Sequence, residues 1–272
     1  MRNRSRRATT CVLVMALSLS LLPALDAAAA TTSGAASIAV PVPAASAASA
    51  PAAPEEVVGM RTRDAKHFRN PDGTFTAVFG HYLHYQSAPG RWDDVDLSLR
   101  PEGPDFVMDK HDLSVRVGAT GVEASEQATG NGIRWLTPTR PSVAGRRARV
   151  NDQGLQWEYA TRISGIKLAA EVGRRRGPRT YEFRYQLVGG ARELAVEAGG
   201  GLRSDRFSVP PAFALGSDGR TYPASAWRLL PGNRVAFDFD DTDLPGDALP
   251  YQLDPTTQFN IATATDDGSA QG

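Results

Sequence analysis

The chain has 272 residues, 41 % of them apolar, with 30 basic and 30 acidic side chains and one cysteine, Cys11. Without residues 1–30, which hold four arginines and one aspartate, 26 basic and 29 acidic side chains remain, a net charge of −3. This near balance, with only a three-residue arginine run at 174–176, argues against a nucleic-acid partner. Because Cys11 is the one cysteine, the chain beyond residue 30 can form no disulfide and has no thiol for catalysis or metal binding.

The N-terminal segment, residues 1–30, has the parts of a secretory signal peptide. Four arginines precede an apolar run of about 15 residues, and small residues with an Ala-x-Ala pattern at Ala28 and Ala30 follow. The run contains Pro23 and is shorter than the roughly 20 residues of a membrane span, so we expect cleavage. The prediction is a secreted, extracellular protein at the cell surface, without a membrane span after cleavage. Export by the Sec or the twin-arginine route fits the segment.

Three further segments follow the signal peptide. Residues 31–56 consist largely of Ala, Ser and Pro, which bury too little apolar surface to offset chain entropy, so we expect a disordered linker. Residues 57–258 have the length of one good-sized domain or two small ones. Residues 259–272 form a polar tail with no strand pattern, and we expect this tail to be disordered.

The folded segment has the pattern of antiparallel strands. Glycine and proline recur every few residues, which breaks helices and marks turns. Between them, apolar side chains alternate with polar ones, most clearly at 155–159, 166–172, 181–187 and 235–239. Such alternation is typical of strands with one buried and one solvated face. We therefore predict an all-β fold, an antiparallel β-sandwich in one or two lobes.

Three short turn sequences predict hairpins in this fold. Pro-Asp-Gly lies within residues 70–75, Pro-Gly within 86–92 and Asp-Gly within 216–222. The second turn separates residues 79–85 from 92–99, so these two segments are expected to pair as strands.

An acidic stretch in the second of these strands is the first candidate site. In a strand, Trp92, Asp94 and Asp96 share one face, while the apolar residues at 95, 97 and 99 face the core with Asp93 at the turn edge. The three solvent-facing side chains form a candidate ligand-binding group. The alternatives are a bound cation or simply the solvated side of a strand.

A second acidic stretch surrounds a Pro-Gly turn near residue 245. Asp240, Asp241 and Asp243 could bind calcium, although their spacing does not follow the known calcium-loop pattern. Apart from this calcium ion, the sequence predicts no cofactor.

Catalytic motifs offer little support for an enzyme. Residues 164–167 read Ser-x-x-Lys but alternate as a strand, so the two side chains diverge, and no nucleophile elbow or phosphate loop is present. We expect a non-catalytic structural or interaction module. One alternative is a carbohydrate- or cell-wall-binding module that stacks sugars on Trp92, although the tryptophans fit a sandwich core better. Another is a secreted glycoside hydrolase with Asp94 and Asp96 as its carboxylates.

The order of several motifs resembles a known family. These are the Arg-rich start of "MRTRDAKHFRNPDGTF", then "HYLHY", "GRWDDVDL", "SDGRTYPASAWRL" and "LPYQLDPTT". Together they resemble, over residues 58–257, the N-terminal region of RHS/YD-repeat, wall-associated proteins and DNRLRE-domain-containing secreted proteins. The resemblance implies an exported, non-enzymatic β-rich module of a surface or toxin-delivery protein. Its partners would be cell-envelope polysaccharide or other surface-protein domains. Relatives continue past the Asp-Pro-Thr, so we expect either a free-standing module or a truncated one.

Overall fold

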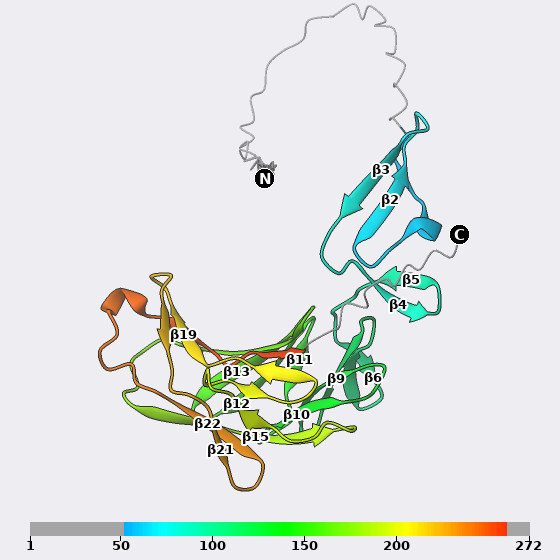
Figure 1. Cartoon of the computed structure of the whole chain (residues 1–272). Coiled ribbons are helices and arrows are strands. Elements are labelled where there is room, and N and C mark those ends of the chain that lie inside the picture. The colour runs from blue at the N-terminus through cyan, green and yellow to red at the C-terminus, as the bar shows by residue number, and fades with distance from the viewer. Residues whose placement is uncertain (1–51, 260–272) are drawn as a thin grey trace, which may run out of the picture. The chain divides into compact units, whose positions relative to one another are not determined.

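A computed structural model describes residues 52–259, whose regular secondary structure consists almost entirely of strands (Figure 1). Two short 3-10 turns, η1 (Val58–Met60) and η2 (Gly246–Ala248), are the only helical elements in this range, so the predicted all-β fold is confirmed. None of its helices is long and apolar enough to cross a membrane. The predicted signal peptide, most of the linker and nearly all of the polar tail lie outside the described residues.

One large sheet has eight strands. They are β6 (Arg100–Glu102), β7 (Asp105–Met108), β8 (Leu113–Gly118), β9 (Gly121–Glu126), β10 (Gly132–Leu136), β15 (Arg179–Val188), β21 (Arg228–Leu230) and β22 (Arg234–Phe239). Their order across the sheet is β21-β22-β15-β10-β9-β8-β7-β6, with every neighbouring pair antiparallel. Strand β15 therefore lies inside the sheet, between β22 and β10.

The other large sheet has eleven strands. They are β11 (Ser142–Ala144), β12 (Arg147–Asp152), β13 (Leu155–Arg162), β14 (Gly165–Val172), β16 (Ala195–Val196), β17 (Leu202–Arg203), β18 (Phe207–Val209), β19 (Phe213–Gly216), β20 (Thr221–Pro223), β23 (Tyr251–Asp254) and β24 (Thr257–Phe259). The main path is β11-β12-β13-β14-β24-β18-β17-β16, and β23 joins β14 to the β19–β20 hairpin. Phe259, which the sequence places in the tail, is buried and pairs with Phe207.

Two small sheets precede the large ones. The first contains β1 (Glu55–Glu56), β2 (Ala65–Arg69) and β3 (Phe75–Phe79), and the second contains β4 (His84–Ala88) and β5 (Arg91–Asp94). Strand β1 consists of the last two residues of the expected linker, which pair with β2 instead of remaining unpaired.

Aromatic side chains from both large sheets fill one core. Trp157 on β13 packs edge-on against Tyr181 and Phe183 on β15, with ring centroids 5.9 and 5.0 Å apart. Trp227 meets Phe237 of β22 at 4.9 Å. All four alternating segments present their apolar side chains to this core, as their period predicted. The sandwich therefore has one shared interior.

The predicted turns form, but both strands of the second hairpin differ from the prediction. The glycines of the three hairpin turns adopt left-handed φ angles of 84°, 73° and 77° at Gly73, Gly90 and Gly219. A hairpin forms around the second turn, but only His84 and Tyr85 of the expected segment 79–85 belong to it, because β4 is shifted toward the turn and Phe79 lies in β3, which pairs with β2. Its second strand, β5, ends at Asp94 instead of continuing to residue 99. The chain leaves the hairpin there to reach the eight-stranded sheet, and Asp96 makes an isolated bridge with Lys110.

Candidate functional site

An arginine-rich loop joins the two large sheets. It spans residues 173–178, between the end of β14 in one sheet and the start of β15 in the other. Its sequence is GRRRGP, and the glycines and the proline end the alternation of both strands. Gly177 has a φ of 67°, which favours glycine and lets the chain turn between the sheets. The three arginines are therefore presented at the rim of the sandwich.

A buried carboxylate, that of Asp241, fixes the backbone of this loop. It accepts hydrogen bonds from the backbone N–H groups of Arg176, at 3.0 and 2.8 Å, and of Gly177, at 2.7 Å. The Tyr251 hydroxyl donates a further bond of 2.7 Å to the same carboxylate. Burial, and then this hydrogen bond, raise the pKa of Tyr251, so its hydroxyl stays a donor. Asp241 is fully buried, and the loop is held from the inside.

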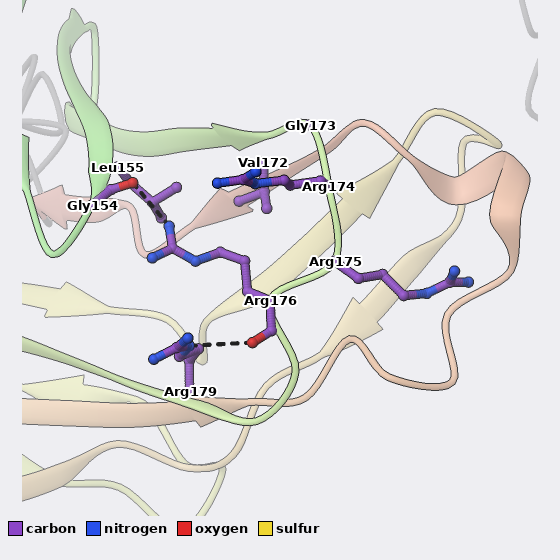
Figure 2. A pocket seen from close by; sticks show the side chains of 8 residues that line it. All are labelled: Gly154, Leu155, Val172, Gly173, Arg174, Arg175, Arg176 and Arg179. Atoms are coloured by element: carbon purple, nitrogen blue, oxygen red, sulfur yellow. Dashed lines mark hydrogen bonds between the residues drawn. The ribbon is translucent and has the colours of Figure 1, made fainter.

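A hollow of about 600 Å³ opens beside the loop, and we call it the arginine hollow (Figure 2). Figure 2 shows the guanidinium groups of Arg174, Arg176 and Arg179 extending to the same side of the loop. Arg175 extends the other way and donates a hydrogen bond to the Leu244 carbonyl. The residues that line the hollow are Gly154, Leu155, Val172, Gly173, Arg174, Arg175, Arg176 and Arg179.

Backbone carbonyls hold two of these side chains in place. The Arg176 guanidinium donates to the carbonyls of Gln153 and Gly154, each at 3.0 Å, in the turn between β12 and β13. Nε of Arg179 donates to the Arg176 carbonyl at 3.2 Å. These acceptors orient the guanidinium groups and carry no net negative charge.

The arginine hollow differs in this respect from most of the charged surface. Elsewhere in residues 52–259 most arginines face a carboxylate, as Arg134 faces Glu123 at 2.5 Å and Arg149 faces Glu158 at 2.8 Å. None of the four arginines of the hollow has a carboxylate of the described residues within 4.0 Å of its nitrogens. Uncompensated like charges in one concave place attract an anion, because each guanidinium offers a planar pair of donors to a phosphate or carboxylate group.

The lining of the hollow offers charged hydrogen-bond donors. Beside the arginines, its lining consists of glycines and the apolar side chains of Leu155 and Val172. Arginine remains protonated and is a poor general base, and none of the lining side chains is a nucleophile. The arrangement can hold an anionic group and orient it.

The first acidic candidate has its charge neutralised within the protein. Asp94, at the end of β5, is contacted by the Lys66 ammonium, by Arg61 at 3.3 Å and by Nε2 of the buried His84 at 3.5 Å. The hydrogen bond from Lys66 is the main cause that lowers the pKa of Asp94. This carboxylate therefore ties β5 to the neighbouring strand β2 and to the segment before it.

Trp92 stays beside Asp94, whereas Asp96 does not. The Trp92 ring is half-buried under the guanidinium of Arg63, 5.9 Å from its centroid, and the Trp92 carbonyl accepts a bond from Arg61. Asp96, beyond the end of the strand, accepts a hydrogen bond from the backbone N–H of Ser98 at 2.9 Å. The three residues therefore do not share one strand face, because β5 ends between Asp94 and Asp96.

The second acidic candidate is also used locally. Asp240 accepts bonds from the backbone N–H and the hydroxyl of Thr242, at 3.0 and 2.6 Å, while Asp241 faces inward to the arginine loop. Asp243 is exposed. Over residues 52–259 no group of three or more His, Cys, Asp or Glu side chains is arranged to hold a metal ion. The calcium hypothesis therefore has no ligand set within the described part of the chain.

Three of the four tryptophans fill the core. Trp135, Trp157 and Trp227 are at most 2 % exposed, so they cannot stack on a sugar from solvent. Trp92 alone remains partly accessible.

Sequence reasoning missed the arginine hollow, although one signal was visible. The run at 174–176 was noted only as too short for a nucleic-acid site. Its position between two segments of alternating residues, flanked by Gly173, Gly177 and Pro178, marks a loop that presents three charges together. The carboxylate that fixes this loop and the turn that walls the hollow lie far away in the sequence.

Comparison with protein-family models, with curated proteins and with solved structures finds no match to this chain. The geometry and charge of the site therefore carry the functional conclusion.

Proposed function

We propose that this chain is an exported, non-catalytic interaction module that binds an anionic polymer of the cell envelope in the arginine hollow. The observation that carries this proposal is the group of three guanidinium groups on one side of the loop beside the hollow, those of Arg174, Arg176 and Arg179, none of them paired with a carboxylate of residues 52–259. Elsewhere in this part of the chain the common arrangement is an arginine paired with an acid, so a ligand that supplies the negative charge completes the site.

Preorganisation of the loop favours binding. The bonds that the loop backbone donates to Asp241 and that Arg176 donates to two carbonyls fix the guanidinium donors before a ligand arrives. A binding site that is already ordered loses less conformational entropy when it binds. Because the hollow is open to solvent, the interaction should weaken with rising salt concentration.

The expected location of the protein selects the ligand class. A signal peptide and a linker would place the module outside the cell, where envelope polymers carry repeated phosphodiester or carboxylate groups. The resemblance to head regions of wall-associated proteins supports the same partner. A polymer also binds more tightly than a single anion, because its neighbouring groups stay at high local concentration after the first contact.

Retention of the full chain on purified bacterial cell walls tests the proposal. The double variant Arg174→Gln/Arg179→Gln removes two donors that face the hollow. Each charge-assisted hydrogen bond contributes roughly 1.5–3 kcal/mol, so the loss of two should lower the affinity by about 100-fold or more. The melting temperature should change little, since neither guanidinium makes an ion pair with the described residues.

The matched control is Arg69→Gln/Arg192→Gln. It removes the same net charge from exposed positions outside the hollow, and its retention should equal that of the wild type. Equal losses in both double variants would reduce the effect to net charge and contradict the proposal. Extraction of the walls with hydrofluoric acid removes phosphodiester-linked polymers. Retention that disappears with extraction identifies phosphodiesters, and retention that survives but still needs the arginines identifies carboxylates.

A further inference from the structure

Two more hollows adjoin the arginine hollow. We call the larger one, of about 740 Å³, the amide hollow, because Gln153 and Gln186 line it together with Glu182 and Arg184. The second, of about 450 Å³, we call the hydroxyl hollow, because Thr180 and Ser225 line it beside Asp238.

Shared residues connect the three hollows. Arg179 lines both the arginine hollow and the hydroxyl hollow. The turn between β12 and β13 lines both the arginine hollow, with Gly154, and the amide hollow, with Gln153. Arg176 donates to the carbonyls of both turn residues, so the boundary between these hollows is a fixed part of the arginine loop.

Strand β15 sets the direction of the connected surface. Tyr181 and Phe183 face the core, so the even-numbered residues of β15 face outward. Thr180 lies in the hydroxyl hollow, while Glu182, Arg184 and Gln186 lie in the amide hollow. A strand rises about 3.3 Å per residue, so Thr180 and Gln186 lie roughly 20 Å apart. That length accommodates several units of a linear polymer but far exceeds one phosphate group.

The chemistry changes along this surface. None of the arginine nitrogens of the arginine hollow has a carboxylate of the described residues within 4.0 Å. The other two hollows contain ion pairs, Glu182 with Arg234 at 3.0 Å and Asp238 with Arg228, beside the charged side chains of Asp152, Arg184 and Asp240. The Thr180 hydroxyl donates to Asp238 at 2.7 Å and the Ser225 hydroxyl to the Ala226 carbonyl at 3.1 Å. Their remaining lone pairs and the exposed amide of Gln186 are the groups that can bond the hydroxyl groups of sugars. Gln153 forms part of a rigid wall, because its side-chain amide bonds to both backbone groups of Glu182, at 2.9 and 2.7 Å.

We propose that the three hollows form one groove for a linear anionic glycopolymer. An anionic group binds in the arginine hollow, and the adjoining sugar units bind along the outer face of β15 in the amide and hydroxyl hollows. This inference rests on the proposed function and narrows its ligand to a sugar-containing polymer.

Titration of the full chain with three probes tests the groove. The probes are glycerol 3-phosphate, inorganic polyphosphate and a purified, sugar-substituted wall teichoic acid. Arg184→Lys/Gln186→Ala alters the amide hollow without changing net charge, and Arg192→Lys/Gln258→Ala is its control at exposed positions outside the three hollows. We expect the amide-hollow variant to bind teichoic acid about 5- to 10-fold more weakly and to bind the other two probes like the wild type.

The Arg174→Gln/Arg179→Gln variant separates the groove from the proposed function. We expect it to weaken binding of all three probes. If it does so while Arg184→Lys/Gln186→Ala leaves teichoic acid binding unchanged, the ligand is confined to the arginine hollow and the groove is disproved. If the arginine variant binds every probe like the wild type, the proposed function itself fails. Equal weakening of teichoic acid by the amide-hollow variant and its control also disproves the groove.

Discussion

Two charged regions of this protein look alike in the sequence and differ in the structure. The acidic end of β5 and the arginine loop each place several like charges within four residues. Around Asp94 the fold brings Lys66, Arg61 and His84, so the carboxylate is satisfied within the chain. Around the arginine hollow the guanidinium groups donate to backbone carbonyls, and the Asp241 carboxylate is bonded to the loop backbone instead.

Under the proposed function, unmet interactions and not a local count of charges distinguish the binding site from the acidic end of β5. A neutralised cluster contributes to the fold, and an anion or cation has little to gain there. A cluster that is oriented but not neutralised can bind an opposite charge at low reorganisation cost. The predictions below test this contrast, beginning with the largest expected effect.

Loss of the buried carboxylate should have the greatest effect. Asp241→Ala leaves the N–H groups of Arg176 and Gly177 and the hydroxyl of Tyr251 without their buried acceptor. Each such loss costs roughly 1–3 kcal/mol, so the free energy of unfolding should fall by about 3 kcal/mol or more, and polymer binding should be lost. Denaturant unfolding measures the first effect. Asp243→Ala, at an exposed neighbouring position, is the control and should leave the free energy of unfolding nearly unchanged. Equal stability of the two variants would refute the role of Asp241.

The buried His111 should make the free energy of unfolding depend on pH, which the arginines of the loop should not do. Burial lowers the pKa of His111 from 6.5 to about 4, and its ring stacks on Tyr82 at 4.8 Å. Between those values the unfolded chain binds a proton that the folded chain does not, so stability falls as the pH falls from 6.5 to 4. The free energy of unfolding that the His111 shift removes over this pH range is about 3 kcal/mol.

His111→Asn isolates this contribution. Asparagine can still accept the hydrogen bond that Leu113 N–H donates to the imidazole, but it does not titrate. Denaturant unfolding at several pH values should show a smaller loss of stability between pH 6.5 and 4 in the variant. An unchanged pH dependence would mean that other groups are responsible.

Removal of the Asp94 charge should have the smallest effect. Its side chain is 53 % exposed, and ion pairs at such positions contribute at most about 1 kcal/mol. Asp94→Asn should therefore change the unfolding free energy by less than this amount and leave retention on cell walls unchanged. Weaker retention would show that the binding surface includes the β5 hairpin, which would remove the contrast between the two regions.

Local patterns were sufficient to predict the secondary structure of the sandwich. The alternation at 155–159 and 181–187 correctly identified which side of β13 and β15 faces the core, because a strand places successive side chains on opposite faces. The glycine-containing turns were also predictable, since their φ angles depend on residues within the turn. The end of β5 at Asp94 was not predictable, because the chain leaves the hairpin there to reach another sheet.

The sequence by itself determined the all-β class, the alternating core and the presence of an arginine run in a loop. Only the tertiary structure decided which charges remain uncompensated. Asp241 is 65 positions from Arg176 and uses its carboxylate on the loop backbone, while Lys66 reaches Asp94 from 28 positions away. Charge compensation depends on distance in space, and pairing between strands far apart in the chain sets that distance.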